Sequence, residues 1–133
     1  MTERLKKIVS AIPFSEELFD VGCDHGIVGV NALLQKKAQR VVFTDVSRPS
    51  LEKARALAIK NGLHDKCEFL CGDGFCGRRA ETAVIAGMGG LEISKILLKA
   101  EQLPDRLVLQ PMRGVPELRL ELSKNYFLER DEI

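Results

Sequence analysis

The chain lacks any apolar run near the roughly 18 residues that a membrane-spanning helix needs, and it lacks a signal-peptide pattern. We therefore expect a cytoplasmic protein that makes no membrane contact. Its net charge is only +1, so it also lacks the broad basic surface typical of nucleic-acid-binding domains. With 133 residues, the chain is long enough for one domain with a buried core and too short for two.

Cysteine and histidine are present in the wrong pattern for a metal site. The four cysteines form no Cys-x-x-Cys pair and only two histidines accompany them, so we predict no bound metal. Cys67 and Cys71 alternate within a strand-like run and are expected to pack as small apolar residues. The thiols are expected to be reduced, as in a reducing compartment.

The most informative motif is Asp20-Val-Gly-Cys-Asp-His-Gly26, which follows a short apolar strand and precedes a helix-like run. Glycines in such a turn let the backbone approach a ligand, and the helix N-terminus presents unpaired N–H groups. The spacing differs from the G-x-G-x-x-G of dinucleotide-binding proteins. Asp20 closes the strand and Asp24 lies inside the turn, and two acidic residues favour a cationic ligand. S-adenosylmethionine, with its sulfonium and α-ammonium groups, is such a ligand.

Strand and helix patterns alternate along the chain, which is typical of a parallel α/β sheet. The expected strands are Leu18 to Val21, Arg40 to Thr44, Cys67 to Cys71, Ala83 to Ala86, Leu107 to Gln110 and a last one over Phe127 to Ile133. The expected helices are Thr2 to Ala11, Ile27 to Leu34, Leu51 to Asn61, Leu91 to Ala100 and Pro116 to Lys124. Between Asp73 and Glu81 the chain is too short for a crossover helix. With a strand order of 3-2-1-4-5, we expect a taut loop there.

At five points the chain resembles the class I S-adenosylmethionine-dependent methyltransferases. Within them it resembles the bacterial tRNA (adenine-N1)-methyltransferases that modify position 22. The motifs are Asp20-Val-Gly-Cys-Asp-His-Gly26 after the first strand, Asp45 after the second, Gly72-Asp73-Gly74 after the third, Ile85-Ala-Gly-Met-Gly-Gly90 after the fourth and Leu109-Gln-Pro111 after the fifth. Each stands at the carboxyl end of a predicted strand, where open α/β sheets bind ligands.

The resemblance implies a Rossmann-like class I methyltransferase fold: a mostly parallel sheet with helices on both faces. It also implies S-adenosyl-L-methionine as cofactor, S-adenosyl-L-homocysteine as product and tRNA as partner. Members of the family continue through a further sheet strand and a helical region implicated in tRNA contact. We expect this sequence, which ends at Ile133, to be one methyltransferase domain without them. An open sheet edge then predicts strand pairing between two copies and a homodimer.

The motif positions assign residues to the cofactor. The expected cofactor-binding residues are Asp20, Gly22, Asp24, His25, Gly26, Asp45, Gly72, Asp73, Gly74, Ala86 and Gly87. Asp45 stands where an acidic side chain takes both ribose hydroxyls, and a helix cap or turn aspartate is the alternative. Asp73 can accept the adenine N6 hydrogens, or form a plain Asx turn. Asp24 can orient the amino group, cap the following helix, or both. His25 is either a pocket residue or a loop histidine.

Three residues are expected where the target base meets the methyl group. Met88 should lie at the rim of the cofactor site, and Gln110 with Pro111 follow the fifth strand. A neutral Gln can hold a base edge without abstracting a proton, which suffices for adenine N1 because that atom already has an in-plane lone pair. Transfer is then an in-line displacement accelerated by positioning. The N1 edge is normally paired, so the base must be flipped or unpaired.

One residue departs from the family pattern. Where the family reads Gln-Pro-Asn, this chain has Met112, which removes a hydrogen-bonding side chain from the expected base site. Two alternatives to tRNA methylation therefore stay open. The chain is either a non-catalytic module that binds S-adenosylmethionine, or a methyltransferase for a different acceptor, since the fold does not determine the acceptor. A dehydrogenase is disfavoured by the glycine spacing.

Overall fold

The computed structural model describes residues 1–126, so the strand predicted over Phe127 to Ile133 lies outside the described residues. The strands are β1 (Ser15–Val21), β2 (Ala38–Asp45), β3 (Cys67–Cys71), β4 (Thr82–Met88) and β5 (Arg106–Pro111). The helices are α1 (Glu3–Ala11), α2 (Ile27–Leu34), α3 (Arg48–Lys60), α4 (Gly90–Lys99) and α5 (Val115–Leu122), with a short 3₁₀ turn at His64–Lys66. Among these residues, none of the helices is both long and apolar enough to cross a membrane.

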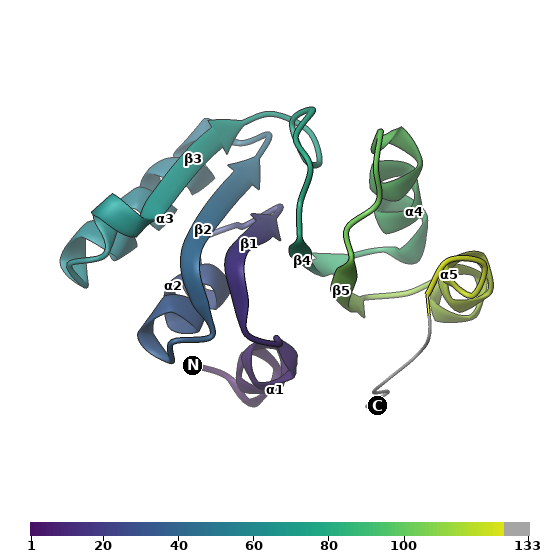
Figure 1. Cartoon of the computed structure of the whole chain (residues 1–133), viewed down its shortest axis with the longest axis horizontal. Helices are drawn as coiled ribbons and strands as arrows, with labels where there is room; N and C mark the ends of the chain where they lie inside the picture. Colours follow the sequence, from purple (N-terminus) through teal and green to yellow (C-terminus); the bar gives the residue numbers. More distant parts are fainter. Residues whose placement is uncertain (127–133) are drawn as a thin grey trace.

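The five strands form one parallel sheet in the predicted order β3-β2-β1-β4-β5. Its central strands are buried on both faces, and successive residues point to opposite sides. Leu18 and Val41 belong to a core shared with α1, α2 and α3, whereas Phe19 and Val42 belong to a core shared with α4 and α5. The sheet is therefore a middle layer with helices on both faces (Figure 1).

The sequence located every described strand and α-helix, with errors at the ends, but not the 3₁₀ turn at His64–Lys66. α2 has the predicted bounds and Thr2 caps α1 through its hydroxyl, which accepts the Leu5 N–H. β1 begins at Ser15 rather than Leu18, because its polar first residues pair with the start of β2 (Ser15 with Ala38). β2, β4, α3, α4 and α5 also begin one to three residues before their predicted starts. The prediction that Cys71 packs in the interior is wrong: it lies exposed at the end of an edge strand.

The connection from β3 to β4 is a loop without a helix, as predicted, but it is not taut. Backbone hydrogen bonds from Cys76 to Asp73 and from Arg78 to Phe75 fold it into two turns. Phe75 is buried and packs edge-on against Phe19, with ring centroids 6.1 Å apart. An aromatic side chain from the loop thus covers part of the sheet face that a crossover helix would otherwise cover.

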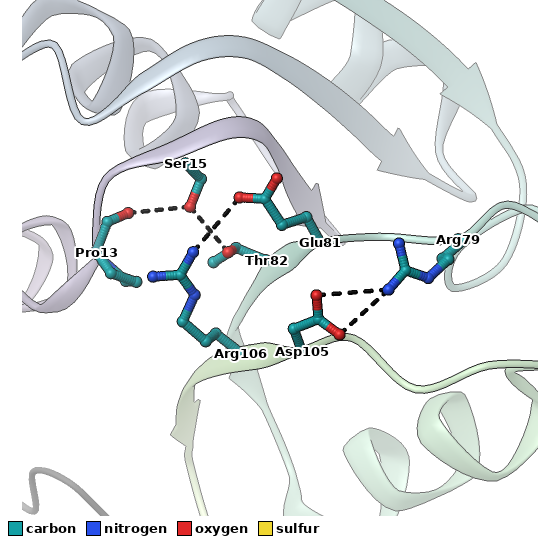
Figure 2. Close-up of polar contacts among 7 residues, drawn as sticks. All are labelled: Pro13, Ser15, Arg79, Glu81, Thr82, Asp105 and Arg106. Atoms are coloured by element: carbon teal, nitrogen blue, oxygen red, sulfur yellow. Dashed lines mark hydrogen bonds and ion pairs between the residues drawn. The ribbon is translucent and has the colours of Figure 1, made fainter.

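The amino-terminal edge of the sheet is closed by polar contacts (Figure 2). The buried hydroxyls of Ser15 and Thr82 share a hydrogen bond of 2.8 Å, which ties β1 to β4. Two exposed ion pairs, Arg79–Asp105 and Arg106–Glu81, join the loop before β4 to the start of β5. Each of these side chains therefore has a structural partner among the described residues.

Gly26 is expected to be intolerant of a side chain. It has φ +77°, and an added Cβ would lie 2.6 Å from Ala54 Cβ and 2.9 Å from Ala54 Cα in α3. Gly26→Ala should combine backbone strain with a clash against a helix, and lower the free energy of unfolding by about 2–4 kcal/mol in urea titration. Gly77→Ala is the matched control, because Gly77 has φ +75° with open space around it. It should cost about 1 kcal/mol, and equal losses would contradict the clash.

Candidate functional site

Three turns meet at the carboxyl edge of β1, β2 and β3, and Asp45 connects the first two. Its Oδ2 accepts the Asp24 N–H at 3.0 Å and its Oδ1 accepts the Ser47 N–H at 2.8 Å. The helix-cap alternative for Asp45 is wrong, because Ser47 caps α3. The bond from the Ser47 N–H to Asp45 closes a turn, so the prediction of a turn aspartate is confirmed. Each carboxylate oxygen keeps a further lone pair that can accept a hydroxyl.

The turn after β1 places a backbone helix terminus beside a buried carboxylate. The N-cap residue of α2 is Gly26, which lies in the αL conformation and has no side chain that could cap the helix, so the prediction that Asp24 caps this helix is wrong. Asp20 does so instead: its Oδ2 accepts the Gly29 N–H in the first turn at 3.0 Å. Burial raises the pKa of Asp20 to about 7, with smaller contributions from the neighbouring Asp45 and Asp24 carboxylates and against the lowering effect of the Gly29 bond.

The Gly72-Asp73-Gly74 turn is held against the end of β2. The Gly72 N–H donates to the Asp45 carbonyl at 2.9 Å, and the Thr44 hydroxyl donates to the Gly74 carbonyl at 2.8 Å. The Asp73 side chain contacts Lys99 Nζ at 3.3 Å rather than its own turn, so the Asx-turn alternative is wrong. Its carboxylate is therefore held at the edge of the site by a cation from α4.

The acceptor side is organised by a β-bulge at Gly87. The β4–β5 register shifts between Ala86 and Met88, and Gly87 takes φ +79°. The Gly87 N–H donates to Gln110 Oε1 at 3.2 Å. Met88 folds over the first turn, because a Cβ on Gly22 would lie 2.2 Å from the Met88 methyl carbon. The bulge thus brings the turn after β4 against both the turn after β1 and the end of β5.

These turns enclose a cleft of about 520 Å³. The predicted residues that line it are Asp20, Gly22, Asp24, His25, Asp45, Gly72, Asp73, Gly74, Ala86, Gly87 and Met88. Three predicted residues do not line it: Gly26, Gln110 and Pro111. Gly26 lies against α3, Gln110 accepts the Gly87 N–H, and Pro111 pairs with Met88 in the sheet. The His25 Nε2 lies 3.5 Å from Asp24 Oδ1 and 3.5 Å from Lys53 Nζ, and half of its side chain is exposed.

In residues 1–126 no group of three or more His, Cys, Asp or Glu side chains could hold a metal ion. All four cysteines are free thiols. Burial raises the pKa of the Cys67 thiol to about 11, so that thiol stays protonated at neutral pH. The cleft thus offers carboxylates, glycine backbone and apolar side chains, and it is also lined by Arg4, Lys95 and Lys99. Its carboxylates are groups that recognise an organic cation carrying hydroxyls.

A family model described as a methyltransferase domain matches residues 1–133. The chain belongs to this methyltransferase family. A Mycoplasma pneumoniae protein, a candidate tRNA methyltransferase, is 35% identical over 112 residues, which cover 80% of this chain and 51% of that protein. The crystal structure of the Bacillus subtilis m1A22 tRNA methyltransferase TrmK is 28% identical with a TM-score of 0.86, and the match covers 100% of this chain and 59% of that one.

A third relative is Sp1610 of Streptococcus pneumoniae, a candidate tRNA (m1A22) methyltransferase solved with S-adenosyl-L-methionine. It is 25% identical with a TM-score of 0.84, and the match covers 93% of this chain and 61% of that one. The resemblance and the Rossmann-like fold predicted from the sequence are confirmed. The methyltransferase domain described here spans 51–61% of the length of these three relatives.

Several cleft residues of this methyltransferase domain were not predicted. Val46 follows Asp45 and is 72% exposed, an apolar surface beside the Asp45 carboxylate, and its place directly after the strand-ending acid could have revealed it. Lys95 and Lys99 come from the exposed face of α4. Arg4 lines the cleft from α1 and donates to Gln110 at 2.8 Å. No local pattern marks this last contact, because the two residues are 106 positions apart.

Proposed function

We propose that residues 1–133 form the cofactor-binding domain of an S-adenosyl-L-methionine-dependent tRNA (adenine-N1)-methyltransferase. The observation that carries this proposal is that eleven residues picked from four separate sequence motifs line one cleft at the carboxyl edge of the sheet. Ligands of open α/β sheets bind at that edge. A relative with the same fold holds S-adenosyl-L-methionine, which is the cation that the acidic first turn favours.

The proposed cofactor pose follows from the donor and acceptor groups of the turns. Asp45 accepts the ribose hydroxyls through the lone pairs that Asp24 and Ser47 leave free. Val46 and the Gly72–Gly74 turn hold the adenine, and Asp73 accepts from its N6 amino group. The methionine portion passes Gly22, where only a glycine leaves room beside the Met88 methyl. Asp20 and Asp24 face its ammonium group.

The proposed reaction is a displacement at the methyl carbon. The lone pair of adenine N1 forms the new N–CH₃ bond as the S–CH₃ bond of the sulfonium breaks, which leaves S-adenosyl-L-homocysteine and a cationic methyladenine. No proton has to leave, so Gln110 and Met88 act by positioning the base. Relatives named for position 22 of tRNA make that adenine the proposed target. We propose a cytoplasmic location, which a tRNA substrate and free thiols support.

The test is methyl transfer from labelled S-adenosyl-L-methionine to an unmodified tRNA transcript, followed by nucleoside analysis. We expect N1-methyladenosine with adenine at position 22 and none when that position is guanine. Binding of S-adenosyl-L-homocysteine without transfer to any RNA would favour the non-catalytic module. Transfer to a small molecule but not to tRNA would favour a different acceptor.

We propose further that two copies of the chain pair through β5. This strand bonds only to β4 among the described residues, and its apolar residues Leu107, Val108 and Leu109 are only partly buried. An open edge with apolar side chains is a template for pairing with another strand. Light scattering at high concentration should give a dimer mass, and a strictly monomeric mass would contradict this pairing.

A further inference from the structure

Gln110, the proposed base-contacting residue, is held by two donors from different parts of the chain. Arg4 in the first turn of α1 donates from Nη1 to Gln110 Oε1 at 2.8 Å, and the Gly87 N–H donates to the same oxygen at 3.2 Å. Both donors line the cleft. The amide of Gln110 therefore lies between the start of α1 and the β4 bulge, next to two residues that line the cleft.

These two bonds determine which way the amide points. Because both neighbours are donors, the atom between them must be the carbonyl oxygen and not the amide nitrogen. A side-chain carbonyl has two lone pairs, and here each is used. The remaining hydrogen-bonding capacity of Gln110 is its NH₂ group, which lies 3.7 Å from the Met112 sulfur, a weak acceptor. The side chain can thus offer a base only a donor.

We propose that Arg4 is a positioning residue that holds the Gln110 amide in this orientation, so that the acceptor base is recognised through a ring nitrogen rather than through its amino group. The inference rests on the proposed function. An adenine presents N3 and N7 as acceptors and N6 as a donor. A carbonyl that is already saturated cannot accept an N6 hydrogen, which disfavours amino-group methylation. Since N1 must keep its lone pair for the methyl group, the Gln110 NH₂ meets N7 or N3.

The first experiment measures kcat/KM on the tRNA transcript with adenosine, 7-deazaadenosine or 3-deazaadenosine at the target position. The wild-type chain should lose about ten-fold or more with one of the two analogues, the scale for losing one hydrogen bond in a closed site. In Arg4→Met the preference for adenosine should fall below about three-fold, because the amide is then held only by the longer bond from the Gly87 N–H. Arg4→Lys, which keeps one donor, should restore part of it.

The matched control is Lys7→Met, which removes a cation from the same helix at a side chain that does not line the cleft. It should keep the wild-type preference. The inference is overturned if the wild-type chain methylates both analogues as fast as adenosine, or if Arg4→Met keeps the wild-type preference. An effect on rate alone, with the preference intact, would likewise assign Arg4 a merely structural role.

A second measurement is independent of catalysis. In the cofactor-free protein, NMR should show nuclear Overhauser contacts from the Gln110 NH₂ protons to the Met112 methyl group. These contacts should weaken clearly in Arg4→Met, where the Gly87 N–H alone still holds the amide, and stay at wild-type intensity in Lys7→Met. If they follow this pattern and no RNA is methylated, the positioning by Arg4 is supported and the proposed function fails. If they stay at wild-type intensity in Arg4→Met, the inference is overturned whether or not RNA is methylated.

Discussion

Asp45→Ala is expected to weaken binding of S-adenosyl-L-homocysteine roughly 10- to 100-fold, which corresponds to about 1.5–3 kcal/mol for lost bonds to a charged acceptor. The reason is that Asp45 has two tasks at one point. It accepts the backbone N–H groups of Asp24 and Ser47, and in the proposed pose it accepts the ribose hydroxyls as well. Removing the carboxylate takes away the ligand contact and releases the first turn from the second. Isothermal titration calorimetry measures the change directly.

Two further variants separate these tasks. Asp45→Asn keeps one of the two acceptor oxygens and removes the charge, so it should lose less affinity than alanine. Its NH₂ group faces one of the two backbone N–H donors, so it should also lose some thermal stability. Asp65→Ala is the matched control, because Asp65 is an exposed acid in the 3₁₀ turn before β3 that does not line the cleft. Its affinity should stay within about two-fold of wild type. Wild-type affinity in Asp45→Ala would remove Asp45 from the ribose site.

Local pattern was sufficient to predict the sheet and most of the cleft. Val41, Val42 and Phe43 form a continuous apolar run because β2 is buried on both faces, and this run made the strand recognisable. Parallel strands bring their carboxyl ends to one edge. Motifs such as Asp20 to Gly26 and Gly72 to Gly74 could therefore be assigned to one site before any distance was known.

The contacts that could not be predicted depend on which residues meet across the fold. Arg4 reaches Gln110 only because α1 packs near the end of β5, and nothing near either residue in the sequence indicates this. The packing of the Met88 methyl on Gly22 and the bulge at Gly87 likewise depend on how neighbouring strands pair. The role of Asp20 as a helix cap was missed for the same reason: its partner, Gly29, lies beyond the turn that the motif describes.

Asp20→Asn is expected to change how stability depends on pH. Burial raises the pKa of Asp20 from 3.8 to about 7 in the folded chain, so between those values the folded protein keeps a proton that the unfolded chain releases. The contribution of Asp20 to stability is therefore fully present below about pH 4 and is lost as the pH rises towards 7. Between pH 5 and 7.5 the wild-type chain should lose on the order of 2–3 kcal/mol from this group alone.

Asparagine keeps an oxygen that can accept the Gly29 N–H but carries no proton to lose. Urea titrations of both chains at several pH values should show wild type losing stability relative to Asp20→Asn as the pH rises, with the difference levelling off above about pH 7. Other titrating groups are the same in both chains, so they cancel in that difference. A difference that does not change with pH would show that Asp20 is already ionised at pH 5. The carboxylate would then be stabilised by the N-terminus of α2 strongly enough to outweigh its burial.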